Sequence, residues 1–325
     1  MKKDYENFKK YLNNNSIPTH MDYLESEIAP DLIRFLKTKI GSKRVTSYYN
    51  FLKYIGEENI PLYSDDENVF IDLIEELIPI VRVDEFLILK DLLNDSELNL
   101  ENLIGYNSRV NLLSLTNALE YLNDKGILNK NKLNIDNISN IKNYLFDLIN
   151  YGLTRYEIEF GDFEGEYKLY SNYTKEQTMV SIKKKFNMNI RLKGTYCDEI
   201  TGDTYIYVGL QKDIDKDLRL NFKDRFISQN IFQWESENYT TKSNNMGIKL
   251  QNTKRVHLFV RKMKEEDNVI LPFTYFGTGT FDNMRESYTE ENGKKYETLL
   301  FDIKLDHEVP EEYRLDFNVP TKEYE

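Results

Sequence analysis

Cysteine, histidine and tryptophan are scarce in this chain of 325 residues, and their scarcity excludes several kinds of site. Cys197 is the only cysteine, which excludes an intrachain disulfide and a thiolate metal cluster. The three histidines, His20, His257 and His307, are too scattered to predict a His-rich metal site from sequence proximity. We therefore predict that this chain holds no metal and no cofactor of its own.

Long apolar runs and phosphate-binding loops are also missing. No run of about 18 apolar residues is present, and residues 1–5 lack the apolar stretch of a signal peptide. We expect a soluble, cytoplasmic protein with no membrane partner. No G-x-x-x-x-G-K-[ST] loop occurs, which excludes an ATPase core from this chain.

Charge is unbalanced towards acid, with a formal net charge of −12. This argues against nucleic-acid binding through bulk charge alone, but local basic stretches stand out within the acidic chain. One stretch runs from Lys183 to Lys193 and the other from Lys249 to Lys264. Each fits either a local phosphate-binding groove or a solvated face of the protein.

The periodicity of apolar residues changes along the chain and predicts two domains. Up to about residue 150, apolar residues recur at intervals of three and four, and Gly41, Gly56 and Gly126 fit helix ends. We predict an all-α helical bundle of about seven helices at residues 1–152.

From about Leu153 the apolar period becomes two, which is typical of strands. The expected strands lie at residues 155–160, 205–210, 256–261, 273–277 and 298–305, with a short helix at 176–186 capped by Thr174. Residues 153–325 are therefore predicted to form an α+β domain with a bent sheet or barrel.

The only tryptophan, Trp234, lies in an unusual run of polar side chains. Gln233, Glu235 and Ser236 adjoin it, and hydrogen-bonding groups beside one large flat ring suit a pocket that stacks a planar base. The alternative is an amphipathic strand in which Phe232, Trp234 and Ser236 share one face.

An ordered series of motifs between Tyr173 and Leu305 resembles a known family. The series consists of Tyr173-Thr174-Lys175-Glu176-Gln177, Lys193-Gly194-Thr195, Val208-Gly209-Leu210-Gln211-Lys212, Phe222-Lys223-Asp224-Arg225-Phe226-Ile227-Ser228, Phe232-Gln233-Trp234-Glu235-Ser236-Glu237-Asn238, Leu258-Phe259-Val260-Arg261 and Pro272-Phe273-Thr274-Tyr275-Phe276-Gly277. It resembles the C-terminal domain of unknown function of bacterial helicases that also bear a phospholipase-D-type nuclease. This chain differs in having Glu235 and Glu237 where that family often has glutamine.

Within that family, the chain is most similar to SauUSI-type, ATP-dependent type IV restriction endonucleases, which are directed at methylated cytosine. The resemblance implies a C-terminal fragment without catalysis of its own, in which residues 1–152 couple a motor to a target-recognition domain at 153–325. It implies an SRA/PUA-like barrel, base flipping, duplex DNA with 5-methyl- or 5-hydroxymethylcytosine as partner, nuclease and helicase domains elsewhere in the parent protein, and ATP and Mg²⁺ as that enzyme's cofactors.

A flipped cytosine needs a stacking surface, an acceptor for its N4 amino group and donors for its other edge. Asp224 is the preferred acceptor and Glu235 the second, although Asp224 equally fits a pair with Arg225 or a helix cap. The further candidates for base recognition are Trp234, Ser236, Asn238, Tyr196, Tyr207 and Tyr239, and Tyr207 also fits a core position in a strand. The candidates for contact with DNA phosphates are Lys183, Lys184, Lys185, Arg191, Lys193, Arg225, Lys242, Lys254 and Arg255.

Two other functions stay open. Asp282 and the triplet Asp302-Ile303-Lys304 fit a Mg²⁺-dependent nuclease, in which two carboxylates hold the metal and a lysine supports the attacking water. The chain also fits a module that binds a protein or RNA.

Overall fold

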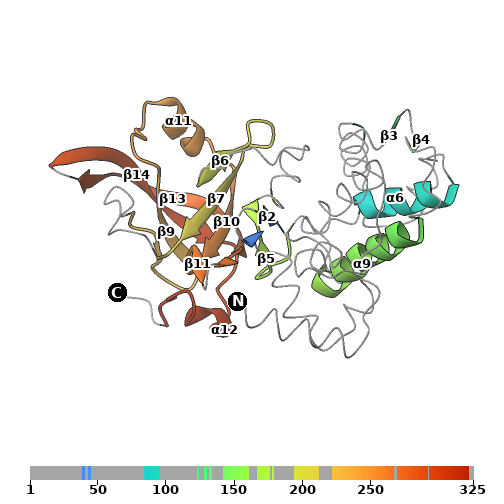
Figure 1. Ribbon diagram of the computed structural model, residues 1–325. Helices are drawn as coiled ribbons and strands as arrows, with labels where there is room; N and C mark the ends of the chain where they lie inside the picture. The colour runs from blue at the N-terminus through green and yellow to red at the C-terminus, as the bar shows by residue number, and fades with distance from the viewer. Residues whose placement is uncertain are drawn as a thin grey trace. The chain divides into compact units, whose positions relative to one another are not determined.

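In the computed structural model the chain forms two compact units (Figure 1). Unit 1 comprises residues 1–164 and 179–186, and unit 2 comprises residues 165–178 and 187–325. The described residues are 39–40, 43–44, 84–95, 123, 128–129, 132–133, 142–160, 167–175, 178, 194–211, 222–266, 269–291 and 293–321.

Two helices pack together in unit 1. Helix α6 spans Asp84–Asp95 and helix α9 spans Lys142–Phe160. The ring of Phe86 lies so close to Gly152 that a Cβ on this glycine would fall 2.5 Å from the Phe86 Cζ. Glycine at position 152 therefore lets the two helices approach each other.

The prediction of an all-α helical bundle is wrong. The described part of the chain is mostly β-sheet with few helices. Two short antiparallel pairs occur within residues 1–152: β1 (Lys39–Ile40) with β2 (Lys43–Arg44), and β3 (Leu128–Asn129) with β4 (Lys132–Leu133). Gly41, Gly56 and Gly126, which the sequence analysis interprets as helix ends, lie outside the described residues.

The predicted strand at residues 155–160 is also wrong, because α9 continues to Phe160. Tyr156, Ile158 and Phe160 do alternate, but Ile158 is 67% exposed. Burial follows the helical spacing instead, through Leu148, Tyr151 and Arg155. The helical spacing of the earlier turns of α9 therefore continues beyond Leu153, where the apolar period of the sequence changes to two.

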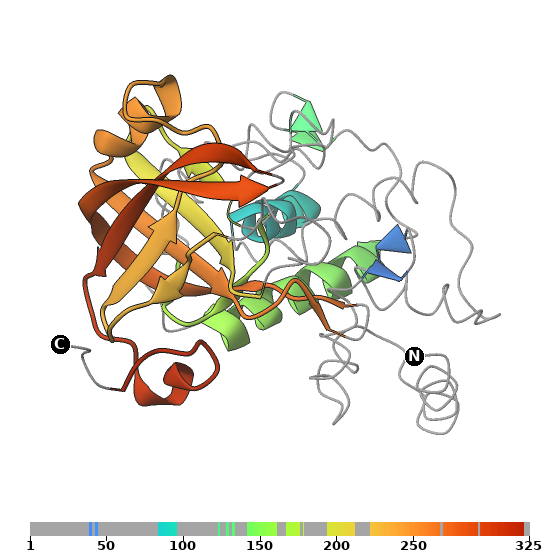
Figure 2. The ribbon, with the colours of Figure 1, turned by 90° about the vertical axis from the view of Figure 1, so that its left-hand side faces the viewer.

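Unit 2 is built on an eight-stranded mixed sheet in the order β6-β7-β10-β13-β14-β9-β8, with β5 paired to β13 (Figure 2). The strands are β5 (Asn172–Tyr173), β6 (Thr195–Cys197), β7 (Asp203–Gly209), β8 (Arg225–Phe226), β9 (Ile231–Glu235), β10 (Arg255–Arg261), β13 (Phe273–Glu291) and β14 (Lys294–Leu305). Only β7 and β10 pair in parallel among these described strands. The predicted strands at 205–210, 256–261, 273–277 and 298–305 are confirmed as β7, β10, β13 and β14.

Smaller elements complete the unit. Helix α11 (Asn245–Gln251) precedes β10, the pair β11 (Glu265–Glu266) and β12 (Val269–Ile270) precedes β13, and α12 (Glu311–Arg314) follows β14. Of the predicted helix at 176–186, only residue 178 lies among the described residues.

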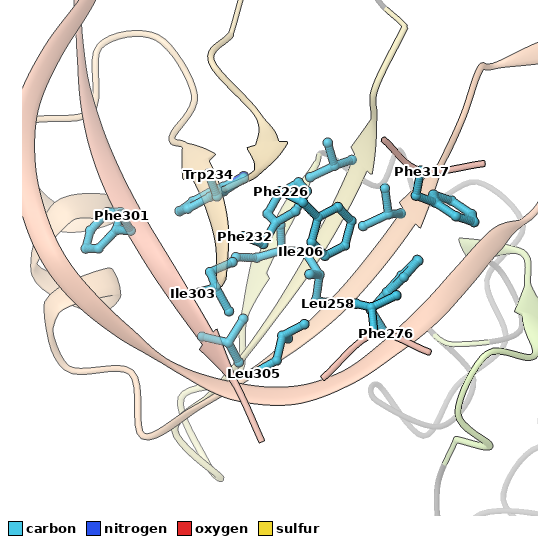
Figure 3. Close-up of a cluster of buried hydrophobic side chains, with 14 of the residues drawn as sticks. Ile206, Phe226, Phe232, Trp234, Leu258, Phe276, Phe301, Ile303, Leu305 and Phe317 are labelled. Atoms are coloured by element: carbon cyan, nitrogen blue, oxygen red, sulfur yellow. The ribbon is translucent and has the colours of Figure 1, made fainter. Parts of the chain in front are cut away.

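The main core lies on the inner side of the curved sheet (Figure 3). Alternate residues of each strand point into it, such as Ile206 of β7, Leu258 of β10 and Ile303 of β14. The opposite face of β7, β10 and β13 is buried as well and is largely aromatic: Tyr205, Tyr207, Phe259, Phe273 and Tyr275. Because both faces of the sheet are covered here, nearly every residue of β7 and β10 is buried.

Candidate nucleic-acid interface

Residues 222–240, where the sequence predicts base recognition, are fixed to β14 by a buried carboxylate. Glu235 is 2% exposed, and its carboxylate accepts hydrogen bonds from the Thr298 hydroxyl (2.6 Å) and the Lys223 backbone N–H (2.8 Å). The Lys223 ammonium lies 4.0 Å from the same carboxylate. A buried carboxylate is tolerable only with such donors, so Glu235 holds the segment in place and does not face an open site.

The neighbouring polar candidates make similar structural hydrogen bonds. Asp224 accepts a hydrogen bond from the Glu235 backbone N–H (2.8 Å). Ser236 is 1% exposed, and its hydroxyl accepts a hydrogen bond from the Leu299 N–H (2.8 Å). Asn238 accepts one from the Thr289 hydroxyl (2.7 Å). Ser236 and Asn238 fasten the segment to the β13–β14 hairpin, whereas Asp224 joins two parts of the segment itself.

Trp234 lies in the core of unit 2 (Figure 3). Its ring is 4% exposed and stacks on Phe281 and Phe301, with centroid distances of 5.6 and 5.8 Å. Phe232 points into the same core from the same strand. Phe232 and Trp234 therefore share one face, as in the alternative that the sequence left open, but Gln233 and Glu235 on the other face are buried as well. A base stacked on Trp234 would have to displace core side chains.

The three candidate tyrosines differ in exposure. Tyr207 is 6% exposed, stacks on Phe259 and shares a 2.6 Å hydrogen bond with Thr178. Tyr196 is half-buried, and burial, followed by the charges of Asp198 and Glu199, raises the pKa of its hydroxyl. Tyr239 is 61% exposed. Of these three rings, only that of Tyr239 is largely open to a ligand.

Tyr239 is also held in an unusual backbone conformation. Its φ of 65° is in the left-handed region, which costs a residue with a side chain about 1–2 kcal/mol relative to an ordinary conformation. Asn244 fixes this conformation, because its side-chain N–H donates to the Tyr239 carbonyl at 2.6 Å while its oxygen caps α11 at Gly247. The edge of the ring meets Tyr296 at a centroid distance of 5.4 Å. The protein thus maintains local strain that presents an aromatic ring to solvent.

The candidate cations are distributed unevenly. Lys183, Lys184, Lys185, Arg191 and Lys193 lie outside the described residues. Arg225 and Lys254 are exposed. Lys242 is exposed and pairs with Glu286 at 3.4 Å, and Arg255 pairs with Asp203 at 2.5 Å. Two of the candidate cations, Lys242 and Arg255, are therefore paired with carboxylates of the protein itself.

The hairpin contributes cations that sequence reasoning missed. The Lys295 ammonium lies 4.3 Å from the centroid of the Tyr288 ring, and that of Lys294 lies 5.3 Å from the Tyr296 ring. Lys223 lies 5.8 Å from the Tyr288 ring. The signal was the run Lys294-Lys295-Tyr296 a few residues after Tyr288, because lysines interleaved with aromatic residues suit phosphates and bases.

The residues of the nuclease hypothesis do not form an open metal site. Asp282 and Asp302 are paired across β13 and β14, but both oxygens of Asp302 accept hydrogen bonds from the Arg285 guanidinium (2.9 and 2.6 Å). Asn283 donates a further hydrogen bond to Asp302 (2.8 Å). Within the described ranges, no three His, Cys, Asp or Glu side chains gather as metal ligands. This arrangement is a structural ion pair that occupies the carboxylate which Mg²⁺ would need.

The described residues contain no helix with the length and apolarity needed to cross a membrane.

Two families of unknown function match the sequence. Residues 167–316 match the family "Domain of unknown function (DUF3427)", and residues 1–136 match "Domain of unknown function (DUF8090)". A search of curated proteins finds no match. The first family match contains the residues, 173–305, on which the resemblance to the helicase-associated domain rests.

Several solved structures are similar to parts of the chain at 10% identity. The DNA recognition domain of the cytosine modification-dependent restriction endonuclease LpnPI has a TM-score of 0.27, with 35% of this chain and 60% of that chain covered, which is less than two thirds of its length. The DNA modification-dependent restriction endonuclease AspBHI has a TM-score of 0.29 (48% and 83% covered). SUVH6 of Arabidopsis thaliana, in complex with SAM, has 0.31 (76% and 41% covered). TM-scores of this size do not establish a shared fold.

Proposed function

We propose that residues 153–325 bind double-stranded DNA containing 5-methylcytosine or 5-hydroxymethylcytosine, with the modified base flipped out of the duplex. In this proposal the chain is the recognition part of an ATP-dependent type IV restriction endonuclease whose nuclease and helicase domains lie elsewhere in the parent protein. Support comes from the ordered motifs between Tyr173 and Leu305, all of which fall within the family match at 167–316.

The observation that carries the proposal is the exposure of Tyr239 on a strained, left-handed backbone. Left-handed backbone in a large aromatic residue is uncommon, and local strain of this kind concentrates at ligand-binding positions. A largely exposed residue can stack its ring on a base, which is worth about 1–3 kcal/mol in complexes with single-stranded nucleic acid. We assign base stacking to Tyr239 and a structural role to the buried Trp234.

Cations near this ring supply the phosphate contacts in the proposal. Lys242 is three residues from Tyr239, and Lys294 lies against Tyr296, the ring that Tyr239 touches. Neutralising phosphates gives affinity for any sequence, whereas contacts to the flipped base give discrimination. Affinity and methylation preference should therefore respond to different residues.

The test compares matched duplexes that differ in one 5-methylcytosine, at about 0.15 M salt, where nonspecific phosphate binding is weak. The wild-type chain should bind the methylated duplex more tightly. Tyr239→Gly should lose that preference and about tenfold or more in affinity, since one stacked base is lost. Glycine adopts the left-handed conformation without cost, so this variant removes the ring and keeps the fold.

Tyr170→Gly is the matched control. Tyr170 also has a left-handed backbone (φ 58°), but its ring stacks on Tyr313 at 4.5 Å and has no assigned role in binding. The control should retain the methylation preference. Equal preference in the wild type and in Tyr239→Gly would remove Tyr239 from the site, and equal binding of both duplexes by the wild type would contradict the proposed function.

A further inference from the structure

The guanidinium of Arg261, at the end of β10, has few hydrogen-bond partners among the described residues. Arg261 donates one hydrogen bond, from Nη1 to the Leu271 carbonyl (3.1 Å). Its Nε is buried and has no acceptor, and burial lowers the pKa of its guanidinium. No hydrogen bond from the other terminal nitrogen, Nη2, is present among the described residues.

A second cation, Lys175, lies beside the same aromatic ring as Arg261. Its guanidinium carbon lies 4.3 Å from the centroid of the Phe273 ring. The Lys175 ammonium lies 5.5 Å from the same ring and 5.2 Å from that of Tyr207. One aromatic ring therefore has two cationic groups close to it, and no carboxylate of the described residues forms an ion pair with Arg261.

Partial burial of a cation without a counter-ion is unfavourable, because the group gives up water and receives no charged partner in return. An oxyanion would supply that partner, and the planar fork of arginine suits the two oxygens of a phosphate. One side leaves room for a further group: β7 places Gly209, which has no side chain, beside Arg261, and a Cβ there would make an ordinary contact, 3.8 Å from the Arg261 Nε.

We propose that Arg261, with Lys175 beside the same ring, forms an oxyanion site that binds one phosphate of the DNA backbone. This inference rests on the proposed function and adds a contact to it. The site is a positioning contact, which fixes where the duplex runs along the sheet and reads no base. Its loss should weaken all sequences alike and leave the methylation preference intact.

The experiment measures the dependence of DNA affinity on salt concentration for the full chain. Each phosphate contact contributes about 0.9 to the slope of log K against log [salt] on duplex DNA, so Arg261→Met should reduce the magnitude of the slope by about this amount. The ratio of affinities for methylated and unmethylated duplexes should not change. An unchanged slope would overturn the proposal.

Two further variants keep the test decisive. Arg314→Met is the matched control, because the Arg314 guanidinium is already bound to the Val309 carbonyl (2.9 Å) and the Gln229 side chain (3.2 Å), and its slope should equal that of the wild type. Gly209→Val keeps the charge of Arg261 but fills the space beside it with a residue that favours strands, and should reduce the slope as Arg261→Met does. A wild-type slope in Gly209→Val would contradict access from this side.

A chain that binds no DNA would refute the proposed function and leave the oxyanion site to be tested with inorganic pyrophosphate. At constant ionic strength, pyrophosphate should raise the melting temperature of the wild type and of Arg314→Met but not of Arg261→Met. No rise in the wild type, or an equal rise in all three proteins, would overturn the oxyanion site.

Discussion

At the scale of single residues, His257 shows how the sheet controls ionisation. Its ring is 3% exposed, stacks on Tyr205 at 4.5 Å and lies 3.0 Å from the Tyr275 hydroxyl. Burial, followed by the positive charge of Arg255, lowers its pKa from 6.5 to about 4, although Asp203 opposes the shift. Folding therefore favours the neutral imidazole.

This shift predicts a pH dependence of stability. Because the pKa is lower in the folded state, the stabilisation is complete above pH 6.5 and is lost as the pH falls from 6.5 to about 4. The loss over this interval should be about 3 kcal/mol in the free energy of unfolding, measured by urea denaturation at a series of pH values. His257→Gln should show a much flatter profile over the same interval. A profile as steep as that of the wild type would show that other groups cause the dependence.

The sequence identified the segment around Trp234 and included Tyr239 among its candidates for base recognition, but it did not distinguish the buried Trp234 from the exposed Tyr239. The polar neighbours of Trp234 favoured a ring that stacks on a base. In the structure these neighbours are buried and form hydrogen bonds across the sheet, as Glu235 does with Thr298. Such partners lie more than 60 residues away in the sequence and are not visible in a local pattern. The left-handed backbone of Tyr239 depends on Asn244 and leaves no signature in composition.

Burial of Trp234 gives a second prediction. Trp234→Ala should destabilise the fold by about 3–5 kcal/mol, because the ring fills space against Phe281 and Phe301 that a methyl group leaves empty. Tyr239→Gly should change the free energy of unfolding by no more than about 1 kcal/mol, since the strain it relieves offsets the contact it removes. Thermal or urea denaturation checks both. Similar losses in the two variants would contradict the assignment of Trp234 to the core and of Tyr239 to the surface.

At the scale of elements, the β13–β14 hairpin is shaped by a bulge. The register shifts between Asp282 and Arg285, and Asn283 adopts a left-handed conformation there (φ 47°). Arg285 bridges the irregularity by binding both oxygens of Asp302. Bulges bend and twist a strand, so this ion pair helps to set the course of the hairpin that carries Tyr288 and Tyr296.

Asp302→Ala should therefore destabilise the fold by about 1–2 kcal/mol, measured by urea denaturation at pH 7. Asp282→Ala, which removes the exposed carboxylate directly opposite, should change stability by no more than about 0.5 kcal/mol. The hydrogen bond from Arg285 lowers the pKa of Asp302 below 3.8, so its contribution should be present above that pH and disappear as the pH falls further. Equal losses in the two variants would contradict this role.

Strands with strong alternation or β-branched and aromatic runs were predictable from the sequence, as β7, β10 and β14 show. The predicted strand at 155–160 failed because helix α9 overrides six residues of alternation through the buried contacts of its earlier turns. Two-residue strands such as β3 and β4 are too short for any period to appear. Local pattern therefore predicted the long strands and missed elements that depend on tertiary contacts.

At the scale of the whole molecule, an acidic chain is proposed to bind a polyanion. The net charge of −12 opposes association, so binding must depend on local cations at the β13–β14 hairpin and around Arg261. Repulsion from the rest of the chain should make affinity for ordinary DNA weak at physiological salt. Discrimination by a flipped base then becomes a larger share of the total binding free energy.

The most direct test of this account is competition between two otherwise identical duplexes for the full chain. A labelled duplex with one 5-methylcytosine is displaced by unlabelled methylated or unmethylated competitor at about 0.15 M salt. We predict that half displacement needs a concentration of unmethylated competitor about tenfold or more higher than that of methylated competitor. This difference should disappear in Tyr239→Gly and persist in Tyr170→Gly. Equal concentrations of the two competitors for the wild type would contradict recognition of modified cytosine.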